Sequence, residues 1–259
     1  KALVVKGVIS ATSDFENLRG CDAINICVPT PFTLSKEPDL SYVVSSSKQI
    51  SKRLRREQLI ILKSTTFPET TEKVVLPILE ESGLRVGRDF YLAYSPERID
   101  PGNKDFTMRN TPVVVGGVTE KCTGMAELLY RKVLDKVFTV SSPRAAEMAK
   151  LLENIFRSVN IALVNELAKL CDRMGNVNVW EVIEAASTKP FGFMPFYPGP
   201  GIGGHCIPVD PYYLSWKARQ YDFHTNFIEL AAETNDDMPY FVANKVVEAL
   251  SSRGICASK

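Results

Sequence analysis

The stretch "LIILKSTT", residues 59–66, joins four apolar residues to a run of hydroxyl side chains. A short, continuous apolar run of this kind is typical of a buried strand. The hydroxyl residues follow at the point where such a strand would end. In open parallel sheets, ligands bind in the crevice outside the carboxyl ends of the strands. The stretch therefore predicts a buried strand that ends at a ligand-binding edge.

The same pattern repeats on both sides of this stretch. Two neighbouring runs also end in small polar residues: "AINICV" (23–28) leads into Val28-Pro29-Thr30-Pro31, and "FYLAYS" (90–95) leads into Ser95-Pro96-Glu97. Further strands are expected at 112–117 and 137–140, with helical patterns at 42–55, 69–82 and 120–134. Strands that alternate with helices predict a mostly parallel, doubly wound α/β sheet.

A long helical pattern follows the sheet region. It starts after Ser142-Pro143, a good N-cap and first-turn pair, and continues to Met174, which gives a rod of about 45 Å. Lys150 and Asn154 are four residues apart and share one face of this helix. Thr119 is the N-cap expected for the helical pattern at 120–134. A second helix is expected from Asn178, which forms a capping box with Glu181, and a last one over 226–250 with a break near Met238-Pro239.

A loop rich in glycine, "PGPGIGGHCIPVDP" (198–211), carries a single cysteine, Cys206. Four of the 15 glycines of the chain lie within six consecutive positions of this loop, 199–204. Glycine allows positive φ and close approach of the backbone, whereas proline restricts φ. Two interpretations remain open from these residues: an irregular surface turn, or a rigid loop around a ligand with Cys206 directed at it.

Composition excludes several classes of function. The net charge of +1 gives no electrostatic basis for binding nucleic acid or a membrane surface. No apolar run approaches the roughly 20 residues that span a bilayer. The six cysteines show no C-x-x-C pair or zinc spacing, so no metal site is predicted. We expect reduced thiols in a cytoplasmic protein, and we expect most of these cysteines to be small buried hydrophobic residues.

Five stretches, in this order, resemble the nucleotide-sugar 6-dehydrogenase family: "CVPTP", "KSTT", "SPER", "AEMAKLLEN" and "GPGIGGHCIPVDP". The resemblance extends over residues 10–250. The cysteine loop is the most specific of the five. It looks closest to the branch that oxidises UDP-N-acetylhexosamines, above all UDP-N-acetylglucosamine, because Val209 stands where the glucose branch usually has lysine.

The resemblance implies a chemistry for this loop. Family members use NAD to oxidise the C6 alcohol of a UDP-sugar to a carboxylate, by way of a cysteine thiohemiacetal and a thioester. By this resemblance Cys206 is the nucleophile, and Lys150 and Asn154 stabilise the oxyanions. Asp210 orients water or tunes the lysine. Glu97 serves the hydrolysis of the thioester, and Thr65 positions the same water or the C6 oxygen.

The resemblance also implies binding residues and partners. The cofactor site would include Val28, Thr30, Ser64 and Cys206. The sugar site would include Glu97, Arg98, Lys150, Asn154, Tyr197, Gly199, Gly201, Gly203 and Gly204. The partners would be a UDP-sugar and a second copy of the chain, joined through the long helix. The product would be a precursor of surface polysaccharides.

The resemblance divides the chain into three parts. Residues 1–141 would be the remainder of a Rossmann-like NAD-binding domain, incomplete at its N-terminus, because the chain does not open with the expected G-x-G-x-x-G turn. Residues 142–239 would form a central helical domain with the cysteine loop. Residues 240–259 would begin the connection to a UDP-binding domain. We therefore expect this chain to be a fragment, inactive on its own.

Two alternatives to this function remain open at this point. The first is a dehydrogenase of the 3-hydroxyacid or 6-phosphogluconate type, which would transfer one hydride and needs no thiol. The second is an inactive remnant that acts only in binding or in dimerisation. The sequence does not decide which UDP-sugar would be the substrate.

Overall fold

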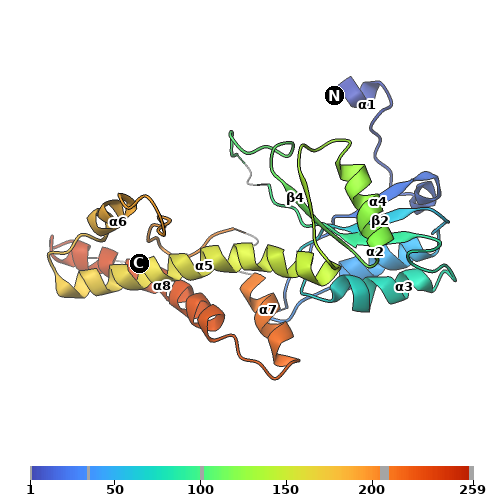
Figure 1. Ribbon diagram of the computed structural model, residues 1–259. Helices are drawn as coiled ribbons and strands as arrows, with labels where there is room; N and C mark the ends of the chain where they lie inside the picture. The colour runs from blue at the N-terminus through green and yellow to red at the C-terminus, as the bar shows by residue number, and fades with distance from the viewer. Residues whose placement is uncertain (1, 34–35, 100–101, 205–209, 257–259) are drawn as a thin grey trace. The chain divides into compact units, whose positions relative to one another are not determined.

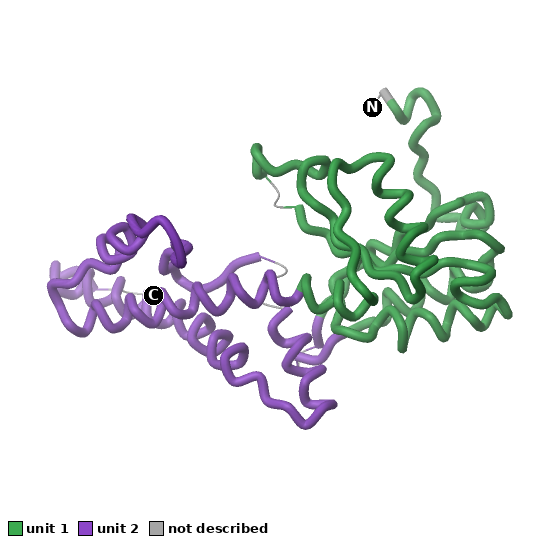
Figure 2. Tube along the Cα trace, in the orientation of Figure 1, with its two compact units in different colours: residues 1–31, 39–150 green, residues 32–38, 151–259 purple. Residues whose placement is uncertain are grey.

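The computed structural model describes residues 2–33, 36–99, 102–204 and 210–256 (Figure 1). The chain forms two compact units, one made of residues 1–31 with 39–150 and the other of residues 32–38 with 151–259 (Figure 2). The first unit contains a sheet with helices, and the second is helical. Helix α5 (Pro143–Met174) begins in the first unit and continues into the second.

The sheet of the first unit has five strands in the order β1-β2-β3-β4-β5. They are β1 (Ala23–Ile26), β2 (Leu59–Leu62), β3 (Tyr91–Tyr94), β4 (Val113–Gly117) and β5 (Val137–Thr139). All neighbouring pairs are parallel except β3 and β4. The expected mostly parallel α/β sheet is therefore confirmed, with one antiparallel pair inside it.

Alternate residues of the strands face two separate cores. Ile60 and Leu92 lie in the core that also receives side chains of α2 (Ser41–Ser51) and α3 (Leu76–Glu80). Ile61 and Ala93 lie in the core that receives Ala126 and Tyr130 of α4 (Glu120–Tyr130). Each fully buried aliphatic side chain contributes about 1.5–3 kcal/mol through removal from water. Helices on both faces make the sheet doubly wound.

The helix expected over 69–82 is shorter and irregular. It consists of a π-helical turn, η2 (Thr71–Val75), followed by the short α3. The N–H of Leu76 donates to the carbonyl of Thr71, five residues back. Pro77 follows at once and has no N–H, and its ring clashes with the carbonyl four residues earlier in a regular helix. The wider turn accommodates this proline.

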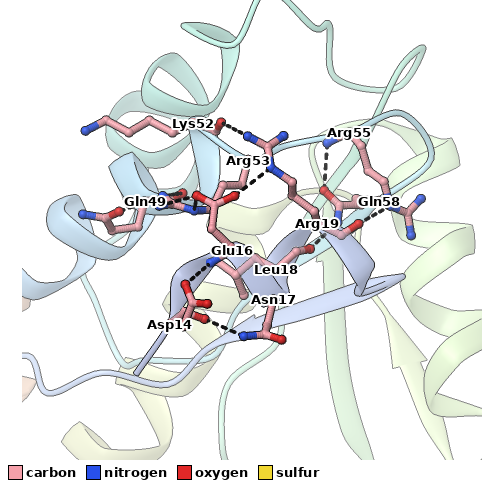
Figure 3. Close-up of polar contacts among 10 residues, drawn as sticks. All are labelled: Asp14, Glu16, Asn17, Leu18, Arg19, Gln49, Lys52, Arg53, Arg55 and Gln58. Carbon is pink, nitrogen blue, oxygen red and sulfur yellow. Dashed lines mark hydrogen bonds and ion pairs between the residues drawn. The ribbon is translucent and has the colours of Figure 1, made fainter. Parts of the chain in front are cut away.

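An N-terminal segment that the pattern did not predict is tied to the sheet by polar contacts (Figure 3). Besides the short α1 (Ala2–Val5), it contains the 3₁₀ helix η1 (Phe15–Gly20). The Gln58 amide, fully buried, donates to the carbonyls of Leu18 at 2.8 Å and Cys21 at 2.7 Å. The Arg53 guanidinium donates to Glu16 at 2.8 Å. These bonds hold η1 beside the residues that directly precede β2.

The second unit contains most of α5, α6 (Val179–Ser187), α7 (Asp210–Arg219) and α8 (Asn226–Ser251). Helix α7 was not predicted. The predicted break near Met238-Pro239 is wrong, because α8 continues through Pro239. Proline leaves the carbonyl four residues earlier, that of Asn235, without its helical donor. Gly201 packs against this carbonyl and against the Pro239 ring, so tertiary contacts cover the weakened turn.

Three predicted helix starts carry the expected caps. The Thr119 hydroxyl accepts from the N–H of Cys122 at 3.2 Å, and the Asn178 side chain accepts from the N–H of Trp180 at 3.0 Å. Ser142 accepts from the N–H of Ala145 at 3.3 Å. Across the described ranges, no helix has the length and apolar character needed to cross a membrane.

The cysteines differ from the expectation of mostly buried thiols. Cys122 is buried, but Cys27 and Cys256 are exposed, and Cys21 and Cys171 are intermediate. Cys27 follows β1, an edge strand of the sheet, and Cys256 lies beyond the end of α8.

Candidate functional site

Hydrogen bonds between Val28 and Ser64, two of the candidate cofactor-binding residues, connect the ends of β1 and β2. The Ser64 hydroxyl accepts from the N–H of Val28 at 2.9 Å and donates to the carbonyl of Val28 at 2.7 Å. Ser64 is buried and Val28 is half-buried. The hydroxyl is thus used by the protein's own backbone. Its role is to hold the turn after β1 in place rather than to bond a ligand directly.

A second pair continues along the same edge. The Thr30 hydroxyl donates to the carbonyl of Thr65 at 2.8 Å, and both residues are half-buried. Sequence reasoning placed these strand ends at one edge, and the structure brings them together. The two pairs form a continuous wall made of Val28, Thr30, Ser64 and Thr65.

Glu97 follows β3 and is fixed through both carboxylate oxygens. Oε1 accepts from the N–H groups of Arg98 and Ile99 at 2.9 and 3.0 Å, and Oε2 lies 3.6 Å from the Lys63 Nζ atom. The Arg98 guanidinium donates to the carbonyl of Pro112 at 2.6 Å. Lys63, only 18% exposed, was not singled out by the sequence, although it directly precedes Ser64.

Glu97, Arg98 and Lys63 line a hollow of about 380 Å³ within the first unit, together with Cys27 and the Tyr130 ring. Desolvation raises the pKa of the Cys27 thiol, Lys63 lowers it, and Glu97 raises it further. The raised pKa keeps Cys27 in its thiol form at neutral pH, whereas a nucleophilic cysteine needs the opposite shift.

Lys150 lies in the third turn of α5, half-buried. Three residues before it, Glu147 is fully buried, and the sequence did not mark this carboxylate. Glu147 accepts from the N–H of Glu69 at 2.6 Å, and from the N–H and hydroxyl of Thr71 at 2.9 and 2.7 Å. Glu147 therefore ties the start of α5 to the segment that follows Ser64 and Thr65.

The Glu147 carboxyl is a weaker acid than an ordinary glutamate. Burial raises the pKa of its carboxyl to about 7, against the hydrogen bonds from Thr71 and Glu69, which lower it, and Glu72 raises it further. Two cations lie nearby: Lys73 is 2.7 Å and Arg144 is 3.4 Å from Glu69, and Arg144 also pairs with Glu72. They compensate the neighbouring glutamates, so desolvation dominates at Glu147.

In the second unit, Asn154 and Asp210 are in contact. The Asn154 amide donates to the Asp210 carboxylate, which is 3% exposed and opens α7. These residues are 56 positions apart in the sequence. The resemblance named both, and the structure brings them together. A second N–H of the Asn154 amide remains available for a further acceptor.

The glycine loop is described as far as Gly204, and Cys206 lies outside the described residues. Within the described part, the N–H of Gly199 donates to the Asn165 side chain at 3.0 Å. Tyr197, 49% exposed, stacks on the Trp180 ring at 5.7 Å between centroids. Gly203 and Gly204 are exposed, and a Cβ atom at either would meet no described residue within 4 Å.

The wall at the ends of β1 and β2 fits the nicotinamide end of a dinucleotide. It lies at the carboxyl ends of parallel strands, where such cofactors bind, and the Thr30 and Ser64 hydroxyls are bonded to the protein's own backbone. It therefore offers a preformed surface for a flat ring. These two hydroxyls offer no site for a pyrophosphate, because they are already bonded to backbone groups.

Two family models match the chain. Residues 1–134 match the NAD binding domain, and residues 144–237 the central domain, of the UDP-glucose/GDP-mannose dehydrogenase family. The two matches cover the sheet region and most of the helical region. The chain therefore belongs to this family of nucleotide-sugar dehydrogenases, and the expected cofactor, NAD, is confirmed.

Curated relatives and a solved structure agree with this assignment. The chain is 41% identical to the UDP-N-acetyl-D-glucosamine 6-dehydrogenase of Pseudomonas aeruginosa over 95% of its length, and spans 58% of that relative. It is 40% identical to the UDP-N-acetyl-D-mannosamine dehydrogenase of Pyrococcus horikoshii over its whole length, and spans 60% of it. The structure of the UDP-D-ManNAc dehydrogenase from Pyrococcus horikoshii has a TM-score of 0.91, with 40% identity, and covers 98% of this chain and 60% of the solved chain.

Proposed function

We propose that this chain carries the NAD-binding and central parts of an enzyme that oxidises the C6 alcohol of a UDP-N-acetylhexosamine to the uronic acid. The contact between Asn154 and Asp210 carries the proposal. It joins two residues of the proposed site, on a helix that also carries Lys150 and at the start of the helix that follows the cysteine loop. The chain's similarity to both glucosamine and mannosamine enzymes leaves the N-acetylhexosamine class as the substrate.

The candidate nucleophile is Cys206. C6 loses a hydride and a proton to become an aldehyde, and the Cys206 thiolate adds to the carbonyl carbon, whose oxygen takes a proton. Loss of a second hydride from C6, with the hydroxyl proton, gives a thioester. Water then attacks the carbonyl, the C–S bond breaks, and the carboxylate and the thiolate are released. Two NAD molecules, bound one after the other, would each accept one hydride, and Val28, Thr30 and Ser64 would form the wall against the nicotinamide end.

Lys150 and Asn154 stabilise the oxygen on C6 as it gains negative charge. An ammonium and an amide donor on one helix face are preorganised for this, because neither has to move when charge develops. Asp210 holds the Asn154 amide in a fixed orientation and orients water or tunes Lys150. The burial of Asp210 keeps this carboxylate close to its donor and away from bulk solvent.

Glu97 holds or deprotonates the water that attacks the thioester, and Thr65 positions the same water or the C6 oxygen. The two backbone N–H groups on Oε1 leave Oε2 as the oxygen that faces Lys63 and the solvent. The sugar itself would contact Arg98, Tyr197 and the backbone of Gly199, Gly201, Gly203 and Gly204. The exposed Tyr197 ring and the open glycines are suited to such a contact.

We also propose that the protein is a cytoplasmic homodimer, joined through α5, that makes precursors of surface polysaccharides. The part of α5 in the second unit keeps a series of apolar side chains exposed: Leu152, Phe156, Leu163, Leu167, Leu170 and Met174. A helix of a soluble monomer rarely exposes so many, whereas a second copy packed on this face would bury them.

Intact-protein mass spectrometry tests the proposed chemistry. In the Glu97→Gln variant, with NAD and UDP-N-acetylglucosamine or UDP-N-acetylmannosamine, we expect an adduct on Cys206 that persists, because the thioester forms but is not hydrolysed. The Cys206→Ser variant is the matched control and should show no such adduct. An unmodified Cys206 together with undiminished NADH formation in Glu97→Gln would contradict the assignment. The test is made on a protein that contains this chain and whose wild-type form oxidises the UDP-sugar.

A further inference from the structure

Helices α5 and α8 of the second unit share a buried pair of amide side chains. Asn165 is fully buried and Asn235 is 4% exposed. The Asn165 amide nitrogen donates to the Asn235 side-chain oxygen at 2.9 Å, and the Asn235 amide nitrogen donates to the carbonyl of Ser158 at 3.1 Å. The Asn165 side-chain oxygen accepts from the N–H of Gly199 at 3.0 Å.

These bonds form one directed chain, from Gly199 through Asn165 and Asn235 to Ser158. In each amide, the oxygen accepts the bond that comes from the Gly199 end of the chain of bonds, and the nitrogen donates the bond that leads to its Ser158 end. Neither amide can be flipped alone without placing two donors or two acceptors against each other. A buried polar group that loses its partner costs about 1–3 kcal/mol, so the chain of bonds selects one arrangement.

The backbone of the loop also runs close to α8. Gly201 has a φ of 116°, and a Cβ atom there would lie 3.4 Å from the backbone carbonyl oxygen of Asn235 and 3.4 Å from the Pro239 ring. The segment 199–201 is thus bonded to α5 at Gly199 and lies beside α8 at Gly201.

We propose that Asn165 and Asn235 are positioning residues that fix the backbone of 199–201, where the proposed sugar site includes Gly199 and Gly201. The proposal rests on the proposed function for the contact of the sugar with these two glycines. Neither asparagine contacts the substrate or the reacting atoms. Each acts through the loop.

Amide hydrogen exchange at Gly199, measured by NMR on the whole chain, tests the anchor without any need for activity. We expect Asn165→Ala to speed exchange at Gly199 at least tenfold, because its acceptor is removed. Asn160→Ala is the matched control: Asn160 lies on the same helix, and its amide donates only to the carbonyl of Phe156, at 2.7 Å. It should leave Gly199 unchanged. Equal exchange in the wild type and in Asn165→Ala, with both folded, would overturn the proposal.

The Asn165→Asp variant separates hydrogen bonding from simple filling of space. A protonated carboxyl has one donor and one acceptor, as the amide has, whereas an ionised carboxylate only accepts. Both forms can accept from the N–H of Gly199, but only the protonated form can donate to the Asn235 oxygen. The thermal midpoint of this variant, relative to that of the wild type, should therefore fall as the pH rises and the carboxylate comes to face that oxygen. The charged groups of both helices at this level, Glu166, Lys169, Asp236 and Asp237, are exposed or half-exposed and are the same in all variants. A flat pH profile would overturn the role of the directed chain.

If a protein that contains this chain oxidises no UDP-sugar, the proposed function fails, and the exchange measurements still decide this proposal.

Discussion

Two glycine pairs occupy opposite environments in this protein. Gly116 and Gly117 end β4, and both are packed against backbone: a Cβ atom at Gly116 would overlap the carbonyl of Ser142, and one at Gly117 would overlap the N–H of Thr123. Gly203 and Gly204, in the loop before Cys206, have no atom within 4 Å of such a Cβ among the described residues. In the sequence, both pairs read as "GG".

The difference separates two reasons for a glycine. At the end of β4, the protein's own backbone takes the space that a side chain would need, so these glycines serve the fold. In the loop, no described residue occupies the space that a side chain at Gly203 or Gly204 would need. Gly204 also has a φ of 99°, which residues with a Cβ rarely adopt. We interpret the open pair as serving the approach of a ligand, in line with the proposed sugar site.

The largest effect on stability is expected at the packed pair. Gly117→Ala should lower the free energy of unfolding by about 3 kcal/mol or more, because the new methyl group meets rigid backbone that cannot move aside. Gly124→Ala, in the middle of the adjacent α4 with open space around it, is the control and should be neutral or slightly stabilising. Urea denaturation of both variants measures this. Equal midpoints would mean that β4 and α4 can separate at little cost.

A smaller effect is expected at Gly204. Its positive φ makes Gly204→Ala cost about 1–2 kcal/mol through backbone strain alone, since no atom obstructs the methyl group. The thermal midpoint and the urea midpoint should both fall modestly. A loss as large as that of Gly117→Ala would show that the loop is packed after all, and would remove the contrast between the two pairs.

The smallest effect on stability is expected at Gly203. Gly203→Ala should change the free energy of unfolding by less than about 0.5 kcal/mol, because the position is exposed and open. Binding should respond differently: if the sugar approaches this backbone, the methyl group should weaken UDP-N-acetylhexosamine binding at least tenfold in titration calorimetry. Unchanged binding in this variant, beside measurable binding by the wild type, would contradict the interpretation of the open pair.

Local features of the sequence were predicted well and distant partners were not. The strand 59–62 is found with the predicted bounds, because its apolar run and the polar residues after it are both local signals. The caps at Thr119 and Asn178 are local in the same way. A regular helix was predicted over 69–82, whereas the structure has a π-helical turn there, because Pro77 changes the turn that precedes it.

The buried polar residues could not be found from the sequence. Glu147 is 76 residues from Thr71, and Asn165 is 70 residues from Asn235, so nothing near either residue reveals its partner. The only available signal was a polar residue between apolar neighbours, as in "ALVNELA", and that signal does not say what the residue bonds. In the candidate site, resemblance named Asn154 and Asp210, but neither spacing nor composition could have paired them.

Glu147 gives the unfolding of this protein a thermochemical signature. Its carboxyl has a pKa of about 7 in the fold and an ordinary pKa of 4.5 in the open chain. Between these values the folded state holds a proton that the unfolded state gives up, so stability is greatest below the lower value and declines as the pH rises toward 7. Near pH 6, unfolding therefore releases close to one proton into the solution. The buffer absorbs that proton, and the measured enthalpy of unfolding should differ between a phosphate and an imidazole buffer by the difference in their heats of ionisation.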